Sequence, residues 1–302
     1  MAGGANPIKA IIAALFANGA IAVAKFVAAA ITGSGSMLAE AVHSTADCGN
    51  QMLLLLGLKQ AKKPPSSDFP LGYGKETYFW SFIVALMLFS LGGMFSVYEG
   101  WHKLHDPEPL SYPIVALVVL GFAIIAESLS MRACLVEVNK SRVRQTLWQW
   151  FKQSRNAELV VIFGEDFAAL LGLVFAFIAV LIAWLTGNPV YDAIGSIAIG
   201  VLLIVVAVFV GVEVKAMLVG QGVEERTRQD MIGFLEQQQD VHAVLNCLTL
   251  QLGPDVMVAV KVKMRPLDTA IDLIDAINRT EALFKRQYPQ VLWLFFEPDH
   301  QD

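Results

Sequence analysis

The sequence predicts a membrane protein in which an all-α domain of six transmembrane helices precedes a small α+β domain. Of the 302 residues, 56% are hydrophobic and only 16% are charged, which is too apolar for a soluble protein. The charge is also uneven, because residues 1–217 carry 14 Lys and Arg against 14 Asp and Glu, so the formal charge of −5 lies entirely in residues 218–302. We therefore expect a membrane domain at residues 1–217 and an acidic soluble domain at residues 218–302.

Six apolar segments are long enough to cross a hydrocarbon core of about 30 Å. They are expected at residues 8–31, 37–58, 78–101, 112–134, 158–185 and 190–215. The first and fifth connections are short and uncharged, whereas the second and fourth are rich in Lys and Arg. By the positive-inside rule, this multi-pass protein has both termini in the cytoplasm, and the expected location is a bacterial inner membrane. The first residues lack the pattern of a cleaved signal, so we expect the first span to be retained.

After the last span, the long apolar runs give way to short alternating ones. We expect a helix at residues 224–238, strands at 243–252 and 256–264, a helix at 269–287 and a strand at 291–296. The order helix, strand, strand, helix, strand predicts a small cytoplasmic α+β sandwich with its helices on one face of the sheet.

The second span carries a polar stripe. Glu40, His43, Asp47 and Asn50 follow one another at spacings of three and four residues, so they share one face of a helix. A charged side chain at mid-membrane costs about 2.5–3.5 kcal/mol on insertion scales, so such a stripe must face protein, water or a bound ion. An imidazole and a carboxylate one turn apart suit a divalent metal, which makes His43 and Asp47 candidate ligands. Glu40 and Asn50 extend the stripe and suit a hydrated access route.

Further carboxylates lie within the fourth and fifth spans. Glu165 and Asp166 are adjacent and point about 100° apart on a helix, so one is expected to be a ligand and the other a neighbour. Glu127 lies midway along the fourth span, where a pathway, a proton relay and a packing role all remain open. An alternative is that these groups only hold helices together, but polar contacts in membranes contribute only about 0.6–2 kcal/mol each.

Three stretches of the sequence resemble the cation diffusion facilitator family of divalent metal/proton antiporters. They are SGSMLAEAVHSTAD at residues 34–47, PLGYGKETYFWS at residues 70–81 and DAIGSI at residues 192–197, together with the six spans and the α+β tail. An apolar residue at Ile162, followed one turn later by Glu-Asp, is similar to the branch that includes an animal mitochondrial zinc transporter.

The resemblance implies a set of metal ligands. In the family, a pair of residues four apart on the second span meets a pair four apart on the fifth in a tetrahedral site. His43 and Asp47 match the first pair and Asp166 matches the second member of the other, whereas Ile162 occupies the remaining position and cannot bind a metal. Water, Glu165 or Asn50 would then complete the shell. The resemblance also implies a homodimer held by the tail, whose corresponding segments lack the histidines of a metal switch.

The expected function is transport and not enzymatic catalysis. The resemblance implies a Zn²⁺/H⁺ antiporter that moves the metal out of the cytoplasm by alternating access at a mid-membrane His/Asp site. Zn²⁺ is then the substrate and H⁺ the counter-ion, with no bound cofactor, and the expected partners are the lipid bilayer and a second copy, with no nucleic acid. Alternatives are an exporter of Mn²⁺, Co²⁺, Fe²⁺ or Ni²⁺ and a passive cation channel. An intramembrane metallohydrolase and a non-transporting scaffold are further rivals.

Overall fold

The computed structural model of the protein describes residues 6–32, 35–107, 112–142 and 145–301. The side chains of residues 32, 35–40, 42 and 43 lie outside this description, although their backbone is included. The chain divides into two compact units. The first contains residues up to 59, 77–152 and 157–215, and the second contains residues 60–76, 153–156 and 216 onward.

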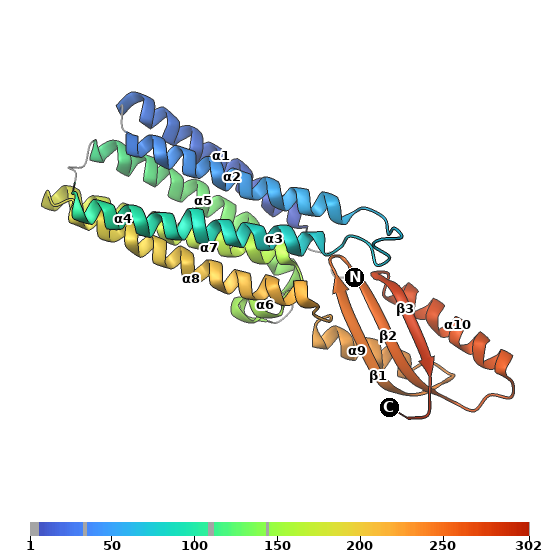
Figure 1. Cartoon of the computed structure of the whole chain (residues 1–302). Coiled ribbons are helices and arrows are strands. Elements are labelled where there is room, and N and C mark those ends of the chain that lie inside the picture. Colours follow the sequence, from blue (N-terminus) through green and yellow to red (C-terminus); the bar gives the residue numbers. More distant parts are fainter. Residues whose placement is uncertain (1–5, 33–34, 108–111, 143–144, 302) are drawn as a thin grey trace. The chain divides into compact units, whose positions relative to one another are not determined.

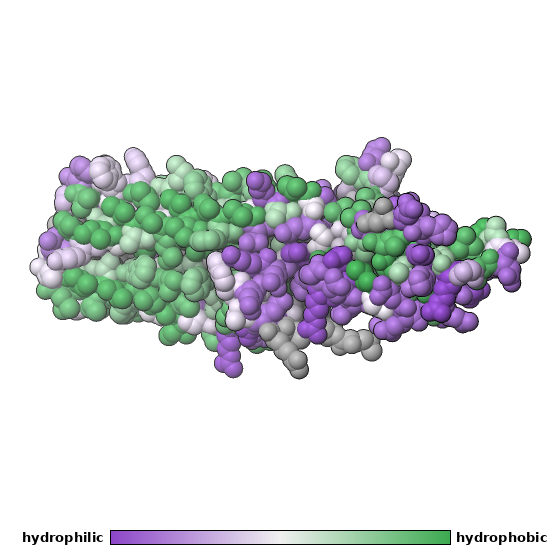
Figure 2. Space-filling model, turned by 90° about the horizontal axis from the view of Figure 1, so that it is seen from below, coloured by the Kyte–Doolittle hydropathy of each residue, from purple (hydrophilic) through white to green (hydrophobic). Residues whose placement is uncertain are grey.

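Long helices make up the first unit (Figure 1). Its elements are α1 (Pro7–Thr32), α2 (Gly35–Ala61), α3 (Glu76–Met87), η1 (Leu88–Met94), α4 (Phe95–His105), α5 (Pro113–Ser141), α6 (Leu147–Gln153), α7 (Ala157–Thr186) and α8 (Val190–Val219). Within the described residues, five helical stretches are long and apolar enough to cross a membrane. The sixth expected span is α2, which has 27 residues but carries the polar stripe. Figure 2 shows that the surface over these helices is largely hydrophobic, as a lipid-facing surface must be.

The third span differs from its expected form. The segments α3, η1 and α4 form one continuous helical stretch, Glu76–His105, with a π-helical section at Leu88–Met94. π-Helical turns inside α-helices occur frequently at functional sites. The side chain of Ser96 donates a hydrogen bond to the Gly92 carbonyl at 2.7 Å and so satisfies one acceptor of this irregular section.

Glycines allow this third span to pack closely against α8. A Cβ atom added to Gly93 would lie 2.5 Å from Ile204, and one added to Gly100 would lie 2.8 Å from the Ala193 carbonyl oxygen. One added to Gly200, on α8, would lie 2.6 Å from the backbone nitrogen of Val97. Small residues of this kind let helix backbones approach in a membrane. Elsewhere in the bundle, α5 packs against both α1 and α7.

The second unit contains the predicted α+β domain. Its elements are α9 (Glu225–Glu236), β1 (Val241–Leu252), β2 (Asp255–Met264), α10 (Ala270–Gln287) and β3 (Val291–Pro298), in the predicted order. The sheet order is β1-β2-β3, with β1 and β2 antiparallel and β2 and β3 parallel. Alternate residues of β2, from Val256 to Val262, are buried in one core with Leu235 of α9 and Phe284 of α10. Both helices therefore cover one face of the sheet, and the predicted fold class is confirmed.

The connection between α2 and α3 also belongs to the second unit, where it contacts the turn between β1 and β2. A Cβ added to Gly74 would lie 2.0 Å from the Leu252 carbonyl oxygen, and one added to Gly253 would lie 2.5 Å from the Gly74 carbonyl oxygen. Gly253 also has a φ of +66°, which L side chains rarely adopt. In addition, Lys75 donates a hydrogen bond to the Leu218 carbonyl at 3.3 Å. Residues 72–75 (GYGK) therefore pack directly against the turn between β1 and β2, and there is no room for a side chain at Gly74.

Candidate metal and proton site

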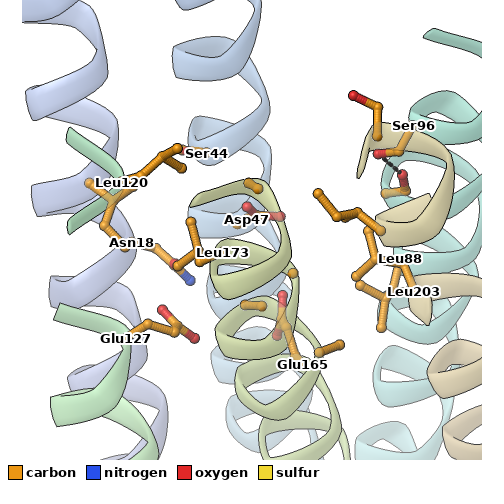
Figure 3. Close-up of a pocket in the computed structure, with 18 of the residues that line it drawn as sticks. Asn18, Ser44, Asp47, Leu88, Ser96, Leu120, Glu127, Glu165, Leu173 and Leu203 are labelled. Atoms are coloured by element: carbon orange, nitrogen blue, oxygen red, sulfur yellow. Dashed lines mark hydrogen bonds between the residues drawn. The ribbon is translucent and has the colours of Figure 1, made fainter. Parts of the chain in front are cut away.

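A cavity of about 160 Å³ lies among the helices of the first unit. Asp47, Glu127 and Glu165 contribute carboxylates to its lining, and they come from α2, α5 and α7. In Figure 3, Asn18 of α1 lies with these three carboxylates on one side, while Leu88 and Leu203 lie opposite. One cavity therefore contains Asp47, Glu127 and Glu165, which the sequence indicated for separate reasons.

The cavity extends along the helices towards one end of the bundle. On α7 its lining runs from Glu165 to Ala176, a distance of about 16 Å at 1.5 Å per residue. On α1 it runs from Asn18 to Lys25. Along both helices, the cavity therefore extends towards the end of the bundle that carries the short, uncharged first and fifth connections. The basic second and fourth connections lie at the opposite helix ends.

A pair of hydrogen bonds fixes Glu165 at the inner end of the cavity. The Asn50 amide donates to one carboxylate oxygen of Glu165 at 3.0 Å, and the Gln51 amide donates to the other at 2.7 Å. All three side chains are buried. Because Asn50 and Gln51 are on α2 and Glu165 is on α7, this amide–carboxylate clamp ties the two helices together. The sequence pattern placed Asn50 and Glu165 near the site but did not indicate that they bind each other.

Asp166 has a different set of neighbours. Its side chain is only 1% exposed, and one carboxylate oxygen accepts a hydrogen bond from Ser130 of α5 at 3.0 Å. Glu127, three residues before Ser130 on α5, is also buried. The second oxygen of Asp166, Oδ1, is buried and has no hydrogen-bond partner.

Other buried oxygens in this region also lack partners. They are Asn50 Oδ1 and Gln51 Oε1, on the same two side chains whose nitrogens hold Glu165. A buried polar atom without a partner is costly, and a cation can satisfy an oxygen acceptor. Two neighbouring helices, α2 and α7, thus both present unsatisfied oxygens.

The predicted ligand set is only partly described. The side chains of His43 and Glu40 lie outside the described residues, although both positions are in the helix α2. Among the side chains that are described, no three from His, Cys, Asp or Glu lie close enough together to hold one metal ion. Ile162 is fully buried on α7, one turn before Asp166, and offers no ligand atom. The set of His43, Asp47 and Asp166 therefore stays a prediction.

The structure adds polar groups that sequence reasoning did not select. Ser130 holds Asp166, Gln51 holds Glu165, and Lys25 lines the cavity with its ammonium group hydrogen-bonded to Ser44 at 2.9 Å. Lys25 could have been selected from the sequence, because an isolated lysine within a long apolar span is costly and indicates a functional site by default. Ser130 and Gln51 had no comparable signal, since polar uncharged residues are frequent in membrane helices.

Comparison with known proteins identifies the family to which this helical unit belongs. The sequence profile described as the cation efflux transmembrane domain matches residues 11–219, which is more than half of the chain. The chain belongs to the cation efflux family. Its predicted relationship to the cation diffusion facilitators is thereby confirmed.

Individual relatives span a wide range of organisms. The mitochondrial proton-coupled zinc antiporter SLC30A9 of Xenopus laevis is 33% identical over 250 residues, covering 82% of this chain and 45% of that protein. Metal tolerance protein C4 of Arabidopsis thaliana is 31% identical over 248 residues, covering 82% of this chain and 54% of the relative. The cation-efflux pump FieF of Shigella flexneri is 23% identical over 258 residues, with 85% and 81% covered. The chain thus spans about half the length of the first two relatives.

Proposed function

We propose that this cation efflux family member exports a divalent metal, with Zn²⁺ as substrate and H⁺ as the counter-ion. The observation that carries the proposal is the unpartnered, buried Oδ1 of Asp166, on the helix next to the one that presents Asp47 to the cavity. A buried carboxylate oxygen without a donor is suited to a cation. The names of the SLC30A9 and FieF relatives, a proton-coupled zinc antiporter and a cation-efflux pump, agree with this chemistry.

In the proposed site, His43, Asp47 and Asp166 hold the metal in the middle of the membrane. The fourth position is filled by water, Asn50 or Glu165, because Ile162 cannot ligate. Metal binding requires a neutral imidazole and ionised carboxylates, so protons compete with the metal for the same atoms. That competition couples the two fluxes: protons that enter a site open to the far side displace the metal. Glu127, which lines the cavity together with Asp47 and Glu165, is the proposed proton relay.

The clamp and the cavity fit alternating access. Asn50 lies nearly one turn beyond Asp47 towards the basic connections, so the contact of Asn50 and Gln51 with Glu165 closes that side of the site. The cavity continues on the opposite side. With basic connections in the cytoplasm, as the positive-inside rule expects, this arrangement is closed to the cytoplasm and leads outward.

A liposome experiment tests the proposal. The full chain is reconstituted with a zinc dye and a pH dye inside, and external ZnCl₂ is added. Zinc entry is expected to be accompanied by proton exit, and an imposed proton gradient, acidic inside, is expected to accelerate it. Zinc entry that neither moves protons nor responds to the gradient would indicate a passive channel and contradict the proposal. Replacing ZnCl₂ by the chloride of Mn²⁺, Co²⁺, Fe²⁺ or Ni²⁺ tests the alternative substrates.

The second unit is proposed to hold two copies together. Leu248 of β1, Ala259 of β2 and Phe295 of β3 lie in register across the sheet on the face opposite the helices. Leu248 is 63% exposed and Phe295 is 56% exposed, so this row is an apolar strip that a partner copy can cover. We expect the purified full chain to sediment as a dimer and the Phe295→Glu variant as a monomer. A monomeric unaltered chain would contradict the homodimer.

A further inference from the structure

Lys25 is a buried basic side chain inside the proposed transport cavity. It lies on α1 and is only 7% exposed, and its Nζ donates a hydrogen bond of 2.9 Å to Ser44 of α2, which is 3% exposed. Lys25 and Ser44 both line the cavity. The lysine is therefore held in place by the helix that also carries Asp47.

The rest of the charged lining is acidic. Among the described lining residues, Asp47, Glu99, Glu127 and Glu165 are carboxylates and Lys25 is the basic residue. Glu99 has a cation of its own, because Lys103 lies 3.1 Å from it. Lys25 thus shares the cavity with three acidic groups near the proposed metal site.

The residue that holds the ammonium group is close to Asp47 along α2. Ser44 and Asp47 are three residues apart on α2, so their side chains are neighbours on one helix face, and both line the cavity. The ammonium group is therefore hydrogen-bonded to a residue that lies about one helical turn from Asp47. A buried ammonium requires nearby acceptors and negative charge, which the cavity supplies.

We propose that Lys25 is a tethered counter-cation: its ammonium group neutralises cavity carboxylates while the metal is absent and competes with the metal for them. This inference rests on the proposed function, because it concerns the same cavity. Any carboxylate charge that the counter-transported protons leave uncompensated would be costly when the metal-free site returns across the membrane. A tethered ammonium lowers that cost, and it also weakens the hold on a dication and so favours release towards the open end of the cavity.

Zinc binding tests the competition. Full-length protein in detergent is titrated with ZnCl₂ by calorimetry, comparing the unaltered chain with Lys25→Met and Lys25→Arg. Removing the competitor is expected to tighten zinc binding about tenfold or more, because a site that is occupied by its own cation shows reduced apparent affinity. Lys25→Arg keeps the charge and is expected to remain close to the unaltered chain. Equal or weaker binding by Lys25→Met would overturn the proposal.

A second readout needs no metal. In chelator-treated protein, Lys25→Met is expected to melt several degrees below Lys25→Arg, since it leaves the cavity carboxylates without their cation. The double variant Lys25→Met with Asp47→Asn removes one charge of each sign and is expected to recover most of that loss. No recovery in the double variant would contradict the counter-cation role even if Lys25→Met is poorly stable.

The two proposals fail in different ways. If Asp47→Ala binds zinc as tightly as the unaltered chain, the transport site is wrong, while the metal-free melting series still decides the role of Lys25. If Asp47→Ala loses zinc binding but Lys25→Met neither tightens it nor shifts melting, only the counter-cation is excluded.

Discussion

Replacing Asp166 or Asp47 by alanine is expected to abolish zinc transport, whereas Glu165→Ala retains measurable activity. Asp166 has a buried oxygen without a partner, and Asp47 contributes a carboxylate to the lining of the cavity. Both oxygens of Glu165 are already occupied by the amides of Asn50 and Gln51. We expect Asp47→Ala and Asp166→Ala each to lower transport by about 100-fold or more. Mutating a residue that only hydrogen-bonds to a metal ligand typically lowers affinity or activity by about 10–100-fold, and loss of the ligand itself should cost more.

The measurement is zinc uptake into liposomes with equal amounts of reconstituted protein. Glu165→Gln is a matched control, because it keeps the size of the side chain while removing its charge. Glu99→Gln is a second control, since Glu99 lines the same cavity but pairs with Lys103. Activity retained by Asp166→Ala together with loss in Glu165→Ala would reverse the assignment of the two adjacent carboxylates.

Replacing Ile162 by histidine is expected to tighten zinc binding. Ile162 is fully buried and lies four residues before Asp166, so the two positions are neighbours on one face of α7. A histidine there would add an imidazole nitrogen where the proposed site has water, Asn50 or Glu165, and four protein ligands are typical of a closed tetrahedral zinc site. We expect a decrease in the dissociation constant of about tenfold or more, measured by calorimetry, with slower transport because release becomes harder.

Two variants control for this effect. Ile162→Leu keeps the apolar character and is expected to leave zinc affinity unchanged. Val161→His places the same imidazole at a neighbouring buried position that points about 100° away, so it cannot share the face of Asp166. Unchanged affinity in Ile162→His, or equal tightening by Val161→His, would mean that α7 does not present the proposed face to the metal.

The fold class was predictable because its signals are periodic or compositional. Apolar runs of membrane length predicted the long helices, and the alternation after Lys215 predicted the order of α9, β1, β2, α10 and β3. Two parts of the chain differ from the expected boundaries. The third span extends through the π-helical section and α4 to His105, and the basic fourth connection contains the short helix α6.

The neighbours of the site residues were less predictable. Helical spacing placed Asp47 and Asn50 on one face, but spacing says nothing about which helix lies opposite. Only the packed structure shows that Asn50 and Gln51 donate to Glu165 while Asp166 bonds to Ser130. Contacts between residues more than 30 positions apart depend on helix rotation and packing, which the apolar pattern of a buried span, hydrophobic all around, does not specify.

The most direct test of the account is the position of zinc itself. Crystals or frozen grids of zinc-loaded full-length protein, with anomalous diffraction recorded at the zinc edge in the crystal case, locate the ion. We expect one peak between α2 and α7 that contacts His43, Asp47 and Asp166. A peak elsewhere, or an Asp166 carboxylate turned away from the zinc in the loaded protein, would contradict it.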